Sequence, residues 1–310
     1  MSPSRPRTGP AGHPDGRTGV VVITFNRRAE LRSTLRRLTR LAERPPVVVV
    51  DNASTDGTAE DVAASFPQVR LVRARQNLGA VGRNIGVRYL STPYVAFCDD
   101  DCWWDSGALR HAADLLDAWP ALATVTGRIV VEPGGHTDPI VAELRDSPLP
   151  RPPWLPGPAL GSILAGASVV RQAAFREVGG FSARMWLGGE EELLSADLAA
   201  QGWWMCYVDD VIVHHRPSTA RDARFRRRLG IRNTLWFAWL RRPVPAAIRR
   251  TLTLARAVPR DATSLAAFAD AVAGLPWVLR ERRVLPHRVE ANLRLLERPQ
   301  RDSVARRYVG

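Results

Sequence analysis

The sequence lacks lysine altogether, so its 44 Lys and Arg positions are all arginine. It also has only three cysteines, Cys98, Cys102 and Cys206, and no second pair accompanies the first two. An odd number of thiols in a chain of 310 residues argues against a disulfide-stapled secreted domain and against a zinc knuckle. We therefore expect reduced, buried cysteines.

Long apolar runs are missing as well. No stretch reaches the roughly 20 apolar residues that span a bilayer. The first 18 residues, rich in Pro and Gly, lack the apolar segment of a secretory signal. We expect residues 1–18 to be a disordered tail, and the protein to be cytoplasmic or peripheral on the inner face of the membrane. With 45% hydrophobic and 24% charged residues, the rest has the composition of a folded chain.

Negative charge is scarce in the last third. Residues 218–310 hold 21 Arg against 7 Asp and Glu, a net charge of +14, whereas residues 1–217 carry a net charge of −1. The use of Arg in place of Lys is a matter of composition, but the segregation of charge is not. It indicates an anionic partner for residues 218–310, either a membrane surface or a polyanion.

Strand patterns alternate with helical patterns from Gly19 to the acidic cluster at 99–101. This order predicts an α/β fold, doubly wound with a mostly parallel sheet, in which ligands bind at the carboxyl ends of the strands. From residue 221 onward the sequence predicts helices that are Arg-rich and interrupted by Pro. The expected strands are 20–25, 47–50, 69–72, 94–98, 124–131 and 211–213, and helices are expected at 78–90 and 190–200, among others.

Carboxylates follow two of these strands directly. Asp51 can accept hydrogen bonds from a nucleobase or a ribose hydroxyl beside a helix N-terminus, although the same segment also fits an ordinary capped turn. Asp99, Asp100 and Asp101 repel one another unless a cation compensates them. A divalent Mg²⁺ or Mn²⁺ ion shared with two phosphates would do so, and it would neutralise a leaving diphosphate.

A third acidic group, Glu190, Glu191 and Glu192, opens the predicted helix 190–200. The helix dipole favours acidic residues there in any case, but one of them could take the proton of an acceptor hydroxyl. Substitution at a sugar carbon with one such base and a metal-bound leaving group inverts the configuration. His214 and His215 end a later strand, where an imidazole either completes a metal shell or has no special role.

Seven segments within residues 19–217 stand out together: VVVITFNR (20–27), VVVVDNASTDGT (47–58), NLGAVGRNIGV (77–87), YVAFCDDD (94–101), VGGF (178–181), GGEEELL (188–194) and VHH (213–215). In this order they resemble family 2 glycosyltransferases with the GT-A fold. The resemblance implies transfer of a hexosyl group, with inversion, from a nucleoside diphosphate sugar to a hydroxyl of a glycan, lipid-linked or natural-product acceptor, with Mn²⁺ or Mg²⁺ as cofactor.

The resemblance also implies a role for individual residues. Glu191 stands where the family usually has the Asp of a Glu-Asp pair and is the candidate base, with Glu190 as the alternative. His214 fits the family's late metal-binding histidine better than His215. Thr24, Asn26 and Asp51 would line the nucleobase and ribose pocket, Asn77, Gly79 and Arg83 would close over the nucleotide, Asp99 and Asp101 would hold the ribose and the metal, and Asp100 would contact the donor sugar.

The resemblance ends near residue 217, so 218–310 form a separate predicted region. Within 221–242, arginines flank a cluster made of Trp236, Phe237, Trp239 and Leu240. Two interpretations stay open: a helix at a membrane interface, or aromatic residues packed on the catalytic core with Arg facing water. The first would suit a lipid-linked acceptor.

Two other functions compete with glycosyl transfer. A sugar nucleotidyltransferase would carry a Gly-rich phosphate loop after the first strand, where this sequence reads TFNRR. A non-catalytic protein that binds a polyanion or membrane would give the carboxylate-rich segments no purpose. For the same reason we expect no nucleic-acid partner, although Arg and Trp on helices could stack on bases.

Overall fold

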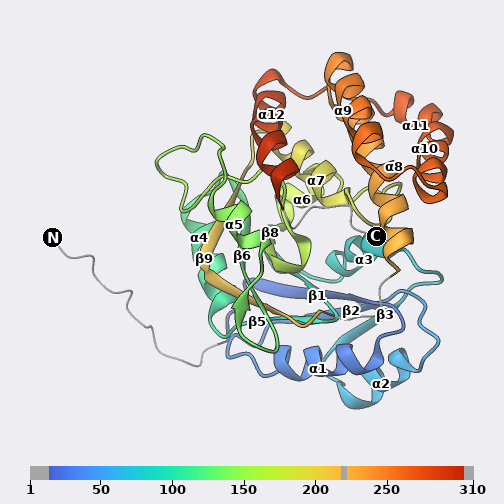
Figure 1. Ribbon diagram of the computed structural model, residues 1–310. Helices are drawn as coiled ribbons and strands as arrows, with labels where there is room; N and C mark the ends of the chain where they lie inside the picture. Colours follow the sequence, from blue (N-terminus) through green and yellow to red (C-terminus); the bar gives the residue numbers. More distant parts are fainter. Residues whose placement is uncertain (1–13, 218–221, 304–310) are drawn as a thin grey trace.

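The computed structural model describes residues 14–217 and 222–303, and it confirms the α/β prediction (Figure 1). Residues 1–13 of the predicted tail lie outside the described residues. The strands are β1 (Thr18–Thr24), β2 (Val47–Asp51), β3 (Arg70–Arg73), β4 (Tyr94–Asp99), β5 (Cys102–Trp104), β6 (Leu122–Val131), β7 (His136–Thr137), β8 (Ser168–Arg171) and β9 (Trp204–His215).

These strands form one sheet in the order β3-β2-β1-β4-β8-β6-β9-β5, with β7 beside β6. The predicted parallel pairing holds across β3-β2-β1-β4. Beyond β4 the sheet is mixed, because β8 runs antiparallel to both β4 and β6, and β5 runs antiparallel to β9. Parallel neighbours need a crossover connection, and helices supply it in the first half of the chain.

Helices cover both faces of the sheet and continue into a helical region at the end of the chain. They are α1 (Arg28–Leu38), α2 (Thr58–Ser65), α3 (Gly82–Val87), α4 (Ala108–Ala118), α5 (Ile140–Arg145), α6 (Gln172–Glu177), α7 (Glu190–Ala200), α8 (Ala223–Arg241), α9 (Val244–Ala257), α10 (Ala262–Ala273), α11 (Leu275–Arg280) and α12 (His287–Asp302). Two single-turn 3₁₀ helices span Gly79–Val81 and Ala165–Ala167.

The side chains of β1 alternate between two cores, as a strand buried on both faces requires. Val20 and Val22 pack in a core with α1, α2 and α4, whereas Val21 packs in a second core with α3, α6 and α7. Figure 1 shows α1 and α2 on one side of the first strands and α3 on the other. The sheet is therefore the middle layer, with helices on both faces. The carboxyl ends of the parallel strands β1, β2, β3 and β4 lie at one edge of this layer.

The helical region builds a third core against α7 rather than standing apart. Trp236 and Phe237 of α8 are buried there beside Leu193 and Ala196 of α7. Of the two interpretations of 221–242, packing of the aromatic residues therefore holds for α8, and Arg221 lies outside the described residues. Within the described part of the chain, no helix combines the length and the apolar character needed to cross a membrane.

Candidate active site

The register of the parallel strands brings the predicted site residues to one edge of the sheet. Thr24 of β1 pairs with Asp51 of β2, and Ile23 pairs with Asp99 of β4. The loops that leave these strands therefore begin side by side.

Asp51 and Asn26 tie the first two loops together. Asp51 is fully buried, and its Oδ1 accepts a hydrogen bond from the Ser54 amide at 3.0 Å. Its Oδ2 lies 3.7 Å from Arg73 Nε and has no hydrogen-bond partner among the residues that the structure describes. Asn26 adopts a left-handed backbone, with φ 52°, and its Oδ1 accepts from the Thr55 amide at 2.8 Å. The two loops are thus joined, and Asp51 Oδ2 is left as a buried oxygen without a hydrogen-bond partner among the described residues.

A third loop, residues 77–80, packs against the segment that precedes α7. Asn77 Oδ1 accepts from the Gly79 amide at 2.9 Å, and the Asn77 carbonyl accepts from Trp186 Nε1 at 3.1 Å. Gly79 has φ +57°, and a Cβ there would come within 2.4 Å of the Trp186 carbonyl oxygen. Only glycine fits this contact, so the place of Gly79 in the motif has a steric cause.

Asp100 is turned into the protein rather than toward a ligand. Its Oδ2 accepts from Thr24 Oγ1 at 2.9 Å, and its Oδ1 pairs with Arg27 Nη1 at 2.5 Å. Burial raises the pKa of Asp100 to about 7, although Arg27 opposes the shift. The expected contact between Asp100 and the donor sugar does not fit this placement, because both carboxylate oxygens are engaged inside the fold.

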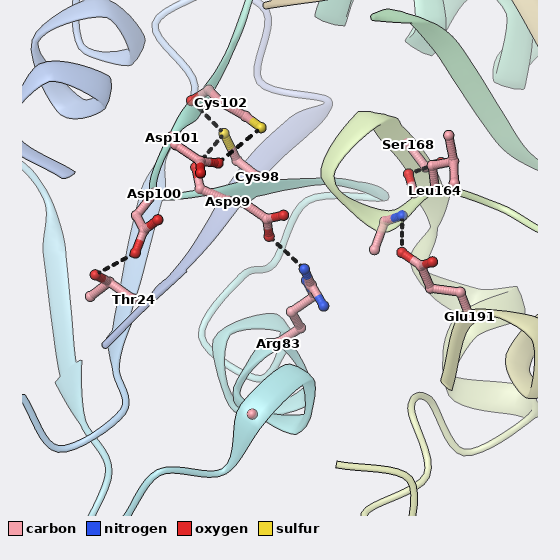
Figure 2. Close-up of polar contacts among 12 residues, drawn as sticks. Thr24, Arg83, Cys98, Asp99, Asp100, Asp101, Cys102, Leu164, Ser168 and Glu191 are labelled. Atoms are coloured by element: carbon pink, nitrogen blue, oxygen red, sulfur yellow. Dashed lines mark hydrogen bonds and ion pairs between the residues drawn. The ribbon is translucent and has the colours of Figure 1, made fainter. Parts of the chain in front are cut away.

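Asp99 faces the opposite way and meets Arg83 (Figure 2). The Asp99 side chain is 42% exposed, and its Oδ1 lies 2.5 Å from Arg83 Nη2. Arg83 itself is buried, and its Nη1 lies 3.9 Å from Glu190 Oε1. The Nε and Nη1 atoms of Arg83 have no hydrogen-bond partner within the described part of the chain. A buried guanidinium with two nitrogens that lack hydrogen-bond partners is suited to bind an anion.

Glu190 and Glu191 open α7 behind Gly189, whose φ is +87°. Glu190 is buried, and burial raises its pKa while Arg83 opposes the shift. Glu191 is half-buried, and its Oε1 accepts from the Ala165 amide at 2.5 Å (Figure 2). Burial, reinforced by the charge of Glu190, raises the pKa of Glu191 to about 7. Such a carboxylate is matched to proton transfer near neutral pH.

The two histidines at the end of β9 face opposite sides of the sheet, as alternation along a strand requires. His215 Nε2 lies 3.7 Å from Asp101 Oδ1. His214 instead stacks on Trp103, with ring centroids 5.3 Å apart, and its Nδ1 lies 3.1 Å from Glu132 Oε1. The structure therefore places His215, and not the preferred His214, beside Asp101 of the acidic cluster, and the choice of metal-binding histidine stays a prediction.

Two residues of this site were not predicted from the sequence. Arg27 joins Asp100 to Asp101, since its Nη1 also lies 3.0 Å from Asp101 Oδ2. Arg27 is the last residue of the segment VVVITFNR, so the sequence held a signal for it. Asn233 of α8 is fully buried, and its Nδ2 donates to the carbonyls of Met185 at 2.8 Å and Leu187 at 3.1 Å. No sequence pattern linked Asn233 to the segment before α7.

Comparison with known proteins gives a consistent result. The family model described as Glycosyl transferase family 2 matches residues 19–178. An N-acetylglucosaminyl-diphospho-decaprenol L-rhamnosyltransferase of Mycobacterium tuberculosis is 28% identical over 278 residues, which cover 76% of this chain and 90% of that protein.

Solved structures share the fold at lower identity. A mannosyltransferase of Pyrobaculum calidifontis, in complex with GDP-Man and Mn²⁺, matches with a TM-score of 0.57 and 20% identity over 93% of this chain and 78% of that chain. Residues 1–349 of S. aureus TarS, in complex with UDP-GlcNAc, match with a TM-score of 0.60 and 15% identity over 89% and 83% of the two chains. These two likenesses establish a shared fold.

Proposed function

Because the chain belongs to glycosyl transferase family 2 and is a glycosyltransferase that uses a nucleotide sugar, we propose that it transfers a hexosyl group to an acceptor hydroxyl with inversion. The observation that carries this proposal is the line of charges from Asp99 through Arg83 to Glu190. In this line, Asp99 of the acidic cluster 99–101 and Glu190 at the start of α7 lie on either side of one buried guanidinium.

The donor would lie along the carboxyl ends of β1, β2 and β4. Thr24, Asn26 and Asp51 would contact the nucleoside, and the loop with Asn77 and Gly79 would cover it. Arg83 would pair with the diphosphate through nitrogens that have no hydrogen-bond partner among the described residues. Within this set, Asp51 Oδ2 and Arg83 Nε and Nη1 are buried atoms without a hydrogen-bond partner among the described residues, so they are the first candidates for contact with the donor.

A divalent ion fits the residues beside this pocket. Asp101 Oδ1 and His215 Nε2 lie 3.7 Å apart, and carboxylate and imidazole are ligands of Mn²⁺-like ions. We propose that Asp101 and His215 hold the ion and that Asp99 faces it from the donor side. When bound, it supplies positive charge to the leaving diphosphate.

Glu191 is the proposed general base, and Glu190 would keep Arg83 oriented through the ion pair between them. Glu191 would take the proton of the acceptor hydroxyl as that oxygen attacks the sugar carbon from the face opposite the diphosphate. A single displacement of this kind forms no covalent intermediate with the enzyme, so the product has the inverted configuration.

The first test is thermal unfolding with UDP, GDP, dTDP or CDP, each with and without Mn²⁺. We expect one diphosphate to raise the melting temperature by several degrees in a metal-dependent way, and Asp101→Ala to abolish that shift. Melting temperatures that do not respond to any of the four would contradict a nucleotide site. NMR of the product's anomeric proton, once the donor is known, decides between inversion and retention.

We propose a lipid-linked acceptor, because the rhamnosyltransferase relative is named for a diphospho-decaprenol substrate. The surface proposed to reach such an acceptor is on α9, because Trp236 and Phe237 of α8 are buried. Val244, Ile248 and Leu252 are about half exposed at a spacing of four residues, so they lie on one face of the helix. The 14 residues of α9 include Arg249, Arg250 and Arg256 and no acidic residue. Exposed apolar side chains among arginines suit an anionic bilayer surface.

Co-sedimentation with vesicles tests this surface. The protein is expected to bind vesicles that contain an anionic phospholipid more tightly than neutral ones, and the triple variant Val244→Ser, Ile248→Ser, Leu252→Ser is expected to lose most of that binding. Leu265→Ser on α10, which changes another exposed apolar residue, is the matched control. Equal binding to neutral and anionic vesicles, or full binding by the triple variant, would contradict the proposal.

A further inference from the structure

A thiol stands beside the proposed metal ligands. Cys102 Sγ lies 3.5 Å from Asp101 Oδ1, and His215 Nε2 lies 3.7 Å from the same oxygen. Ligand atoms of all three residues lie within 4.8 Å of one another. Cys102 is directly opposite His215 in the β5–β9 ladder, so two strands and the turn before β5 converge on this point.

These separations fit a single ion. A carboxylate oxygen or an imidazole nitrogen at about 2.0 Å and a thiolate at about 2.3 Å from a tetrahedral centre lie about 3.3–3.5 Å from one another. The thiol-to-carboxylate distance of 3.5 Å and the imidazole-to-carboxylate distance of 3.7 Å are close to these values, and the imidazole and the thiol lie within 4.8 Å of each other. Asp101 also borders a cavity of about 220 Å³, lined in part by Trp103 and Arg216, so an ion could enter from solvent.

The neighbouring thiol of Cys98 has a different surrounding. Its Sγ lies 3.1 Å from the Cys102 carbonyl and 3.5 Å from the Asp99 carbonyl, so it faces main-chain oxygens. Cys206 sits in β9 beside Val125 of β6, remote in register from His215. The chain therefore offers two buried cysteines as internal controls for Cys102.

We propose that Cys102 is a third protein ligand, with Asp101 and His215, and that this site takes thiophilic divalent ions such as Co²⁺, Zn²⁺ and Cd²⁺ as thiolate complexes. On binding, the thiol releases its proton to solvent and a metal–sulfur bond forms, with no change of oxidation state. The inference rests on the proposed metal-dependent function but concerns which ions the site prefers. A soft ligand shifts preference away from Mn²⁺ and Mg²⁺ toward these ions.

Titration of the intact protein with Co²⁺ alone tests the ligand directly. We expect a near-ultraviolet absorption band for thiolate-to-Co²⁺ charge transfer, present in the wild type and in Cys98→Ser and Cys206→Ser, and absent in Cys102→Ser. Calorimetric titration is expected to show Zn²⁺ affinity falling by about tenfold or more in Cys102→Ser. The affinity for Mn²⁺, which binds thiolates weakly, is expected to change by less than about threefold.

The outcomes separate this inference from the proposed function. Co²⁺ binding without the band, or a band that survives in Cys102→Ser, would overturn the thiolate ligand. The metal-dependent effect of a nucleoside diphosphate on the melting temperature would then still stand by itself. A protein that binds neither Co²⁺ nor Mn²⁺, with or without a diphosphate, would overturn both.

Discussion

Two buried arginines, one in the site and one in the helical region, have opposite surroundings. Arg242, the residue that follows α8, pairs through Nε and Nη2 with the two oxygens of Glu290, at 2.9 and 3.0 Å, and its Nη1 lies 2.6 Å from Glu297. Arg83 makes one short contact, with Asp99, and two of its nitrogens have no hydrogen-bond partner in the described part of the chain. Both side chains are about 5% exposed or less.

Under the proposed function, the difference separates a structural charge, Arg242, from one that binds the donor, Arg83. A buried guanidinium whose donors are all used holds two helices in place, here α8 and α12. A buried guanidinium with unpaired donors destabilises the fold until an anion binds to it. Such an arginine is retained where binding of that anion is its function. The four predictions that follow test this contrast.

Removal of the structural charge is expected to have the largest effect. Arg242→Met leaves the buried Glu290 with the half-exposed Arg294 as its remaining partner among the described residues, so the free energy of unfolding should fall by about 3–5 kcal/mol. Urea denaturation followed by circular dichroism measures this. The double variant Arg242→Met, Glu290→Leu should recover most of the loss, and a double variant as unstable as the single one would contradict the pairing argument.

Removal of the functional charge should act on catalysis instead. Arg83→Gln is expected to lower kcat/KM for the nucleotide sugar by about 10²–10³-fold, the usual cost of losing a donor to developing negative charge. Its melting temperature without ligand should stay within a few degrees of wild type. A large loss of stability with activity retained would reverse the roles assigned to Arg83 and Arg242.

The link between the two regions can be weakened at Asn233. Asn233→Ala leaves the carbonyls of Met185 and Leu187 without their buried donor, at a cost of about 1–3 kcal/mol in the free energy of unfolding. Because these carbonyls precede α7, kcat should also fall. Asn292→Ala is the control, because Asn292 lies on α12 and lines a cavity elsewhere, beside Trp203 and Arg288. An effect of equal size at both positions would argue against a specific link.

The smallest effect concerns pH. Burial raises the pKa of Glu191 to about 7, and a base acts only in its deprotonated form. The value of kcat/KM should therefore rise with pH and level off above about 7, falling about tenfold per unit below it. In Glu191→Gln the residual rate should lose this dependence, whereas Asp100→Asn, which removes another carboxyl with a raised pKa, should keep it. A flat wild-type profile from about pH 5.5 to 8 would contradict the assignment of the base.

The sheet edge was predictable because the apolar runs of β2 and β4 stop at a carboxylate and that of β1 reaches a threonine. Thr24, Asp51 and Asp99 needed only the rule for parallel sheets to be placed together. The helix that begins at Glu190 was also predicted with its bounds, 190–200. The GT-A fold and the glycosyltransferase class, inferred from the order of the motifs, are confirmed by the family match.

The orientation of single side chains was not predictable in the same way. The choice between His214 and His215 depends on which face of the sheet each side chain of β9 points to. The pairing of β9 with β5, a strand of three residues that the sequence did not predict, determines which of them lies opposite Cys102. Asp100 turns inward because Thr24 and Arg27 engage it, a contact between residues far apart in the chain. The predicted domain boundary at 217/218 stays a prediction.

The amide of Asn233 has a consequence for how relatives of this protein could exchange parts. It reaches from α8 to the main chain just ahead of Glu190. A chimera that joins the sheet of this protein to the helices of another would inherit a start of α7 with its neighbouring carbonyls bare, unless the donor brings an amide to the same place. We therefore expect functional chimeras to keep the helical region and α7 from the same parent protein.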